Sequence, residues 1–308
     1  MDPAPETIGA EESESLLDGV SQTLFGCLEA AAPSSVVEIG AFQGDFTREL
    51  LTWGAGAGAR VTAIEPVPQP ELIALTKRHP ELDLIEKPSL EVLGELPRSD
   101  AVIVDGDHNH YTVLQELRQI AEGAGEEGMP IVFLHDVGWP HARRDTYYEP
   151  ERIPEEYRQP LARDAVLAPG VAGMAELGLP FPWAAAREGG EGNGVLTAAE
   201  DFVRESEGLR LAVIPAFFGL GVLWRSDAPW ADQVGAVVAP LDRNPMIERM
   251  EELRIAGIMD RIRLAHHEAL LRSFLNSRAF TDAERLSRIR QRGDPVFSRE
   301  KVKRVLGD

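Results

Sequence analysis

Five short apolar runs between residues 35 and 136, separated by helical stretches, constrain the fold of this chain more than any other feature. The runs cover 35–40, 59–66, 82–87, 100–107 and 129–136, and the helical stretches cover roughly 46–53, 69–79, 89–95 and 109–122. Continuous runs rich in β-branched residues that alternate with helices are typical of a parallel sheet covered on both faces. The sequence therefore predicts an α/β fold built on a Rossmann-like, doubly wound, mostly parallel sheet.

The remaining segments extend this sheet domain at both ends. Apolar residues at helical spacing predict a helix within 13–32, so residues 1–33 form an N-terminal helical segment. A helix at 193–206, followed by two strand-like runs around a turn, predicts a hairpin that adds an antiparallel edge to the sheet. The domain then spans 34–228, and a charged helical extension follows at 229–308.

The charge of the chain excludes two classes of partner. The 308 residues carry a formal net charge of -20, which repels phosphate backbones and anionic lipid. The longest apolar run, 211–224, is too short to span a bilayer and contains proline and glycine. The single cysteine, Cys27, excludes an internal disulfide and is typical of a reducing cytoplasm. We therefore expect a cytoplasmic protein that binds a small molecule rather than nucleic acid or a membrane.

Polar side chains and glycines gather where the predicted strands end. In doubly wound sheets, ligands bind outside the carboxyl ends of the strands. The residues at these positions are Glu38, Gly40, Glu65, Ser89, Asp105, Asp107, His135 and Asp136. The carboxyl edge of the sheet is therefore the predicted ligand site.

The loop after the first strand differs from that of dinucleotide-binding folds. Its pattern is Glu38-x-Gly40-x-x-x-Gly44, in which the first position is an acid and only two glycines remain. A pyrophosphate needs backbone N–H groups at a helix N-terminus and no carboxylate beside them. Glu38 therefore favours a ligand that is cationic or carries hydroxyl groups. Glu65, at the end of the second strand, is placed to accept from two ribose hydroxyls, although an acid there also occurs in nicotinamide-binding folds.

Several stretches together resemble one enzyme family. VVEIGAFQGDFT resembles the first motif of the class I S-adenosylmethionine-dependent methyltransferases, and AIEPV resembles the acid that ends the family's second strand. KPSLEVLGELP, SDAVIVDGDHNHYTVLQEL and IVFLHDV continue the likeness to the methyltransferase-24 type, a relative of catechol, macrolide and aminocoumarin-sugar O-methyltransferases. The likeness covers about 34–136 and extends more loosely to 225. It implies S-adenosylmethionine as the cofactor and methyl transfer as the activity.

The resemblance also implies cofactor contacts, position by position. It gives the methionine end of the cofactor to Glu38, Gly40 and Gly44, the ribose to Glu65, the adenine edge to Ser89 and Leu90, and the rim below the sulfonium to Asp105. The sequence departs from the family at Pro88, where an aspartate is common before the serine. An adenine contact through that side chain is therefore absent, which weakens the assignment of Ser89.

The DGDH and HD strand ends support three interpretations. In the first, His108 or His135 is a general base oriented by Asp107 or Asp136. In the second, the resemblance to metal-dependent relatives implies a divalent ion on Asp105 (or Asp107) and Asp136, which lowers the pKa of a substrate hydroxyl. His135 departs from that pattern, because an imidazole suits Zn²⁺, Mn²⁺ or Fe²⁺ better than Mg²⁺. The candidate metal ligands are Asp105, His135 and Asp136. In the third, the histidines only cap the strand ends.

Residues 137–193 break the strand–helix rhythm and are rich in proline, glycine, arginine and tyrosine. A long segment of this kind inside a compact domain is typical of a functional lid. The candidate substrate-binding residues are Trp139, Arg143, Arg144, Tyr147 and Tyr148. The alternative is that the arginines pair with the abundant acids while the tyrosines pack the loop.

These observations lead to one expected function with stated alternatives. We expect methyl transfer to a hydroxyl of a small molecule, and the resemblance points to natural-product or sugar metabolism. The alternatives are N-methylation of a small molecule, a nicotinamide-dependent oxidoreductase, and a scaffold that keeps the fold without catalysis. The helical C-terminus is the expected interface of a homodimer.

Overall fold

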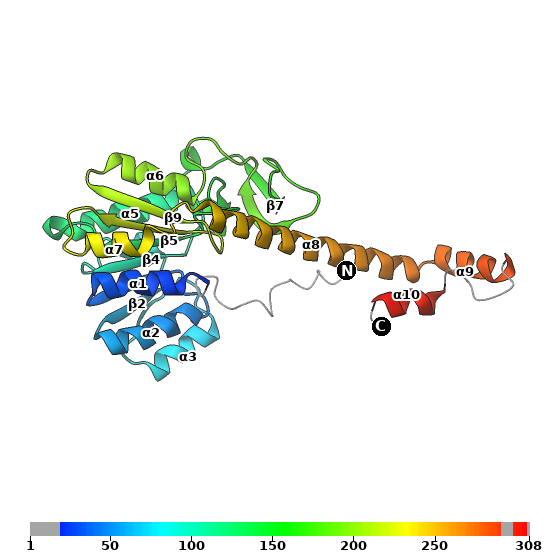
Figure 1. Cartoon of the computed structure of the whole chain (residues 1–308), viewed down its shortest axis with the longest axis horizontal. Coiled ribbons are helices and arrows are strands. Elements are labelled where there is room, and N and C mark those ends of the chain that lie inside the picture. The colour runs from blue at the N-terminus through cyan, green and yellow to red at the C-terminus, as the bar shows by residue number, and fades with distance from the viewer. Residues whose placement is uncertain (1–18, 291–297, 307–308) are drawn as a thin grey trace.

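The computed structural model describes residues 19–290 and 298–306, and its centre is a seven-stranded sheet (Figure 1). The strand order is β3-β2-β1-β4-β5-β10-β9. The strands are β1 (Ser35–Ile39), β2 (Arg60–Ile64), β3 (Asp83–Ile85), β4 (Ala101–Val104), β5 (Ile131–His135), β9 (Leu209–Ile214) and β10 (Leu220–Arg225). The first five strands pair in parallel, so the predicted Rossmann-like sheet is confirmed.

The predicted hairpin is present at the end of the sheet, but its second strand, β10, lies next to β5, and its first strand, β9, forms the edge. β10 pairs antiparallel with β5, and β9 pairs antiparallel with β10. The antiparallel strand is therefore an inner strand, and β9 at the edge runs in the same direction as β5. Every residue of β10 from Leu220 to Trp224 is buried, as an inner position requires.

Helices cover both faces of the sheet, because successive strand residues alternate between two hydrophobic clusters. Val36 packs into one cluster and Val37 into the other. The first cluster contains side chains of α1 (Ser21–Ala31), α2 (Asp45–Ala57), α3 (Pro70–Arg78) and α7 (Ala231–Val238). The second contains side chains of α4 (Ser89–Val92), α5 (His110–Ala124) and α6 (Val195–Glu205). The helices α1 and α7, from the two terminal segments, thus belong to the core of the sheet domain.

The segment 137–193, expected to lack a core of its own, contains a small antiparallel sheet. Its strands are β6 (Thr146–Tyr147), β7 (Leu161–Leu167) and β8 (Leu179–Ala185), in the order β6-β8-β7. Ala165, Leu167 and Ala184 form a third buried cluster under this sheet. The segment therefore has a sheet and a buried cluster of its own, and its closure as a lid stays a prediction.

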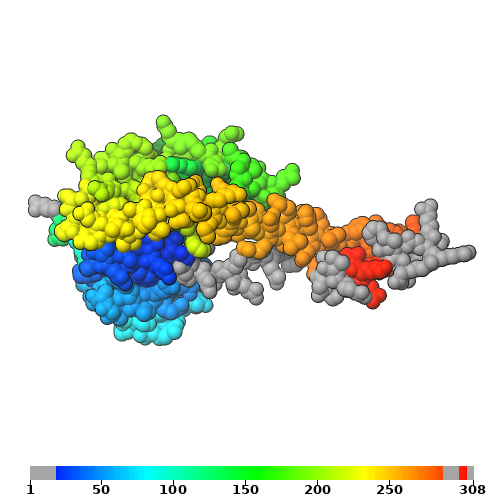
Figure 2. Space-filling view, in the orientation of Figure 1, coloured from blue at the N-terminus to red at the C-terminus, as the bar shows by residue number. Residues whose placement is uncertain are grey.

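The C-terminal extension is helical where the structure describes it, as expected. Helix α8 (Pro245–Leu275) leaves the body of the protein as a long arm and carries α9 (Arg278–Arg290) and α10 (Arg299–Leu306) at its far end (Figures 1 and 2). Asn244 caps α8 by accepting hydrogen bonds from the backbone N–H groups of the first turn. Ile255 and Met259 in the first half of α8 are buried, whereas Leu264 in the second half is 59% exposed. A homodimer through these helices stays a prediction.

Within the described part of the chain, no helix combines the length and apolar character needed to cross a bilayer.

Gly40 fixes the edge of the sheet where the predicted ligand site lies. It follows β1 with a φ of +90°, and a Cβ at this position would lie 2.2 Å from the backbone oxygen of Asp105. Its N–H donates to the carbonyl of Ile64. The ends of β1, β2 and β4 can converge only because residue 40 has no side chain.

We predict that Gly40→Ala destabilises the protein by about 2–4 kcal/mol, because the added Cβ meets backbone and the positive φ is strained. Gly56→Ala is the matched control: Gly56 lies within α2, and a Cβ there meets nothing within 4 Å. We expect the control to gain about 0.5–1 kcal/mol from helix propensity. Urea unfolding followed by circular dichroism measures both changes, and equal stability of the two variants would contradict the packing argument.

Candidate functional site

The structure brings the predicted site residues to one edge of the sheet. In the parallel register, Glu38 of β1 lies beside Ile103 of β4 and Ala63 of β2, so these strands end at the same level. Glu65 and Asp105 directly follow their strands. The carboxyl edge therefore carries the acids of three neighbouring strands, as the sequence predicted.

Glu38 is a buried carboxyl group at this edge. Its side chain is 2% exposed, and its Oε2 accepts a hydrogen bond of 2.6 Å from Thr47 Oγ1 on α2. Burial raises the pKa of Glu38 to about 8, although the Thr47 hydrogen bond opposes the shift. A buried acid that is hard to ionise is stabilised by a cation, so this position is suited to an ammonium or a sulfonium group.

Glu65 holds the glycine-containing loop in place. Its Oε2 accepts from the N–H of Phe42 at 2.9 Å, and its Oε1 accepts from the N–H of Val67 at 3.0 Å. Phe42 has a φ of +45° and its side chain is 59% exposed above the loop. Each carboxylate oxygen keeps one further acceptor position, which is what two ribose hydroxyls would need.

The expected adenine contacts lie at the start of α4, where a second buried acid is found. Ser89 Oγ donates to Glu116 Oε1 of α5 at 2.5 Å, and the carbonyl of Leu90 accepts from Gln119 Nε2 at 3.3 Å. Burial raises the pKa of Glu116 to about 8. The hydroxyl of Ser89 is thus already engaged. Sequence analysis missed Glu116 because it sits inside an amphipathic helix, where an acid normally faces solvent.

Five side chains lie at the ends of β4 and β5: His135 ends β5, and the other four, Asp105, His108, Asp136 and His141, follow the two strands. Asp105 Oδ1 lies 3.0 Å from His135 Nδ1 and 3.8 Å from His108 Nε2. Asp136 Oδ2 lies 2.8 Å from His108 Nε2, 3.7 Å from His135 Nδ1 and 4.0 Å from His141 Nε2. Asp105, His135 and Asp136, predicted as a group, therefore do lie together. A metal ion on them stays a prediction.

His135 uses both ring nitrogens. Its Nδ1 faces Asp105 Oδ1, and its Nε2 donates to the carbonyl of Phe217 at 3.0 Å. Although burial opposes protonation, the charges of Asp105 and Asp136 raise the pKa of His135 to about 9. In this arrangement His135 has no lone pair to offer a substrate, which counts against its predicted role as a general base.

The turn at Phe217 and Phe218, which accepts the hydrogen bond of His135, is itself fixed by helix α8. The N–H groups of Phe217 and Phe218 donate to the carboxylate of Glu251 on α8 at 3.0 and 2.9 Å. Arg254 pairs with Glu251 at 2.7 Å and lies over the ring of Phe218. Both phenylalanines have a positive φ, so these contacts fix a strained turn.

His108 and Asp107, the other predicted catalytic residues, differ in what they can do. Although burial opposes it, the charge of Asp136 and the polar contacts with Asp105 and Asp136 raise the pKa of His108 well above its ordinary value. Asp107 accepts from Thr112 Oγ1 at 3.1 Å, while its buried Oδ1 has no hydrogen-bond partner among the described residues. Burial raises the pKa of Asp107. Asp107 is therefore the member of this pair with open acceptor capacity.

His141 is another residue at this edge that the sequence analysis did not single out. It lies in the segment after β5, buried, with its ring stacked 4.4 Å from that of His108 and its Nδ1 3.0 Å from Thr146 Oγ1. Burial lowers the pKa of His141 to about 3, so the ring is neutral. The signal in the sequence was a histidine five residues beyond the HD strand end. That histidine lies within the segment 137–193, which the sequence predicts to be a lid.

The predicted substrate-binding residues divide into engaged and available groups. Arg143 forms an ion pair with Glu200 at 2.6 Å, and the buried guanidinium of Arg144 donates to four backbone carbonyls of residues 171–173 and 185. Tyr147 is buried, and its hydroxyl donates to Asp145 at 2.8 Å. These contacts count against an acceptor-binding role for the three residues.

Tyr148 and Trp139 are placed differently from the engaged residues. Tyr148 is 67% exposed, and its ring centroid lies 6.0 Å from that of His108. Trp139 is half-buried against the small sheet. Tyr148 is therefore the predicted acceptor contact that the structure leaves both exposed and beside the histidine cluster.

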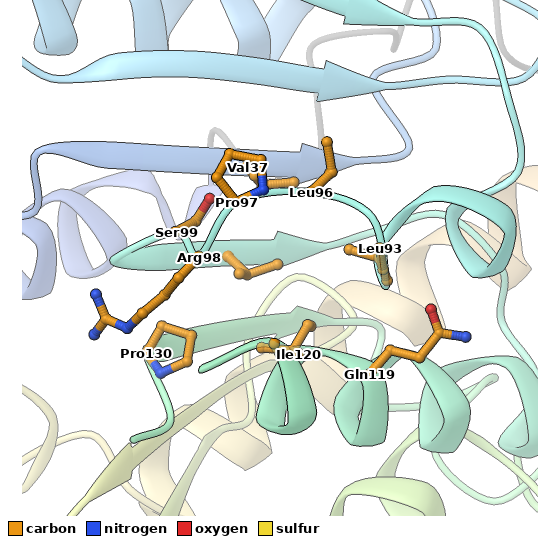
Figure 3. A pocket seen from close by; sticks show the side chains of 11 residues that line it. Val37, Leu93, Leu96, Pro97, Arg98, Ser99, Gln119, Ile120 and Pro130 are labelled. Carbon is orange, nitrogen blue, oxygen red and sulfur yellow. The ribbon is translucent and has the colours of Figure 1, made fainter. Parts of the chain in front are cut away.

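A cavity on the α5 side of the sheet does not belong to this site. It is lined by Arg98, Ser99 and Pro130 at the amino ends of β4 and β5, and by Leu93 and Ile120 from the helices (Figure 3). Its volume of ≈ 30 Å³ has room for little more than a water molecule. The carboxyl edge remains the candidate ligand site.

Comparison with known proteins gives matches among solved structures only. No family model and no curated protein matches the chain. The methyltransferase PaMTH1 of Podospora anserina, bound to S-adenosylhomocysteine, is 16% identical over 67% of this chain and 78% of that chain, with a TM-score of 0.41. The cofactor-bound protein Rv0187 from MTB is 16% identical over 68% of this chain and 81% of that chain, with a TM-score of 0.39. At this level the likeness concerns the fold alone and carries no argument about function.

We predict that Glu38→Gln stabilises the protein in a pH-dependent way. Because the pKa of Glu38 is raised to about 8, the folded state binds a proton that the unfolded state releases at lower pH. The parent protein therefore loses stability as pH rises through the raised pKa. Relative to the parent, the variant gains roughly 2–4 kcal/mol between about pH 5 and about pH 8.5.

Denaturant unfolding across this pH range measures the gain of Glu38→Gln. Glu71→Gln is the control, since Glu71 is an exposed acid in the first turn of α3. We expect the control to leave the pH dependence of the parent unchanged. Parallel stability curves for the parent and Glu38→Gln would show that Glu38 is ionised in the folded protein and would overturn the argument.

Proposed function

We propose that this protein is an S-adenosylmethionine-dependent methyltransferase that acts on a hydroxyl group of a small molecule. The observation that carries the proposal is the buried carboxyl group of Glu38 beside the glycine loop, with the carboxylate of Glu65 fixed across the same loop. Two carboxyl groups at this edge are poor partners for a pyrophosphate, which needs N–H donors, and suit a cofactor that carries an ammonium, a sulfonium and a ribose.

The resemblance and the geometry support the same placement of the cofactor. The methionine end would lie at Glu38, Gly40 and Gly44, and the ribose at Glu65. The adenine would lie along Leu90 and Ser89, although Ser89 already donates to Glu116. An ammonium group beside Glu38 favours the ionised carboxylate, so binding of the cofactor is coupled to proton release from a group with a pKa of about 8.

The reaction proposed is a direct displacement. The acceptor oxygen attacks the methyl carbon, the C–O bond forms, the C–S bond breaks, and S-adenosylhomocysteine leaves with the electron pair on sulfur. The chain's contribution is positioning and exclusion of water. We assign the proton of the acceptor to Asp107, because its Oδ1 is without a partner among the described residues and burial raises its pKa.

The donor set beside Asp105 is compatible with a divalent ion, which the resemblance also implies. Such an ion lowers the pKa of an acceptor hydroxyl. The roles of Tyr148 in contacting the acceptor and of the segment 137–193 in closing over it belong to the same proposal. A role in natural-product or sugar metabolism rests on the resemblance alone, and N-methylation is the second candidate because an amine would use the same displacement.

Binding of S-adenosylmethionine tests the proposal most directly. We expect S-adenosylmethionine to raise the unfolding temperature and to bind stoichiometrically in calorimetry, whereas NAD does neither. Glu65→Gln should weaken the binding of S-adenosylmethionine by about tenfold or more, because the ribose hydroxyls lose a charged acceptor. The exposed Glu71→Gln serves again as the control and should bind as the parent does.

Stabilisation by NAD without S-adenosylmethionine would favour the oxidoreductase alternative and reject this proposal. With cofactor binding established, transfer of a labelled methyl group to a panel of phenols, sugars and amines separates O- from N-methylation. Cofactor binding with no transfer to any member of these classes would favour the scaffold alternative.

A further inference from the structure

The strongest feature that the proposed function leaves unexplained is the convergence of three imidazoles and two carboxylates. They form two groups of three that share Asp136: His108, Asp136 and His141, and Asp105, His135 and Asp136. We propose that the first group, His108, Asp136 and His141, binds a single transition-metal dication, with Asp105 and His135 beside it.

The distances fit a shared ion. Ligand atoms about 2.0–2.2 Å from one metal lie about 2.8–3.1 Å apart when adjacent and about 4.2 Å apart when opposite in an octahedral site. The separations from Asp136 Oδ2 to the three histidine nitrogens are 2.8, 3.7 and 4.0 Å. Those from Asp105 Oδ1 to His135 and His108 are 3.0 and 3.8 Å. All five separations are shorter than that of opposite ligands, and those of 3.7 and 3.8 Å lie between the adjacent and the opposite values.

The contact between His108 and Asp136 is a short ion pair whose atoms are not aligned as a hydrogen bond. The two atoms lie 2.8 Å apart, yet the buried Nε2 of His108 has no hydrogen-bond partner among the described residues. At this distance an ion pair would normally align the N–H with the carboxylate oxygen. A nitrogen and an oxygen that approach closely without that alignment are arranged as two ligands of a common metal are.

Contacts outside the cluster orient two of the rings. His135 Nε2 donates to the carbonyl of Phe217, which turns its Nδ1 inward, and Thr146 Oγ1 lies 3.0 Å from His141 Nδ1, which turns its Nε2 inward. Metal-binding histidines generally use the second ring nitrogen in this way. His135, His141 and Asp136 are all buried, so the donors are fixed before any ion binds.

The donor set selects the class of metal. Mg²⁺ prefers oxygen ligands and retains water, whereas Zn²⁺, Mn²⁺ and Fe²⁺ accept imidazole. The carboxylates balance the charge of a dication, and His141 adds an imidazole nitrogen to the donor set. His141 lies outside the three ligands expected from the sequence, and it is the residue that moves the site away from a magnesium type. This inference deepens the proposed function, because the ion would lie beside the acceptor hydroxyl.

Metal titration of the full chain tests the inference. After removal of metal with a chelator, the protein is titrated with Zn²⁺, Mn²⁺ and Mg²⁺ by calorimetry. We expect one ion per chain and at least about 100-fold tighter binding of Zn²⁺ than of Mg²⁺. His141→Gln should weaken the binding of Zn²⁺ by about tenfold or more.

His110→Gln is the matched control for the titration. His110 is another half-buried histidine, paired with Asp201 at 2.8 Å and outside the cluster. We expect this variant to bind Zn²⁺ as the parent does. Binding of Mg²⁺ as tight as Zn²⁺, absence of stoichiometric binding, or an equal loss in both variants would overturn the inference.

X-ray absorption of the zinc-loaded parent protein covers the case in which His141→Gln does not fold. We expect outer-shell scattering from at least two imidazoles, and a spectrum with oxygen ligands alone would reject the site. The same samples are titrated with S-adenosylmethionine. If the protein binds Zn²⁺ but not S-adenosylmethionine, the metal site is supported and the proposed methyltransferase function is rejected. If it binds S-adenosylmethionine but not Zn²⁺, only the metal site is rejected.

Discussion

The close approach of Gly40 to the backbone of Asp105 is the constraint on which the site depends. It brings the ends of β1 and β4 together with no side chain between them, so that a buried acid on one strand faces an acid that follows the other. The charge of Asp105 contributes to the raised pKa of Glu38, together with burial. A single glycine thus determines both the shape of the loop and the electrostatics around it.

The site retains groups that an apolar core would not contain. Glu38 and Glu116 are both fully enclosed, each held by one hydroxyl, and each with a pKa raised to about 8. Burial of a carboxyl group at that cost in stability is typical of positions kept for a ligand. The two acids lie on opposite faces of the sheet, so each face carries one buried carboxyl group near this edge.

The sheet and the polar edge could be predicted because both follow from local patterns. The β-branched runs give the strands, and the end of each run gives the place where a polar residue meets a ligand. The inner position of β10 could not be predicted, since strand order depends on long-range pairing. Nor could the burial of Arg144, because a guanidinium in a loop has the same sequence signature whether it binds solvent, an acid or backbone carbonyls.

His141 shows where sequence reasoning is limited in the site itself. Its neighbours in the chain are typical of a surface loop, and only the folded structure places its ring between those of His108 and Phe181 of β8. The resemblance pointed to the ends of the strands and not to this loop. A motif that covers only the core strands cannot identify a site residue that lies in a segment inserted after them.

The hydrogen bonds from Phe217 and Phe218 to Glu251 have a consequence for how the chain can be divided. They connect helix α8 to the turn whose carbonyl binds His135, so the path from the extension to the histidine cluster is only a few bonds long. A boundary at residue 228 follows the composition of the sequence, yet it separates the acid from the turn that this acid holds. The arm is therefore not an interchangeable appendage: any shortened or recombined version of this protein has to inherit the first turns of α8 together with the sheet.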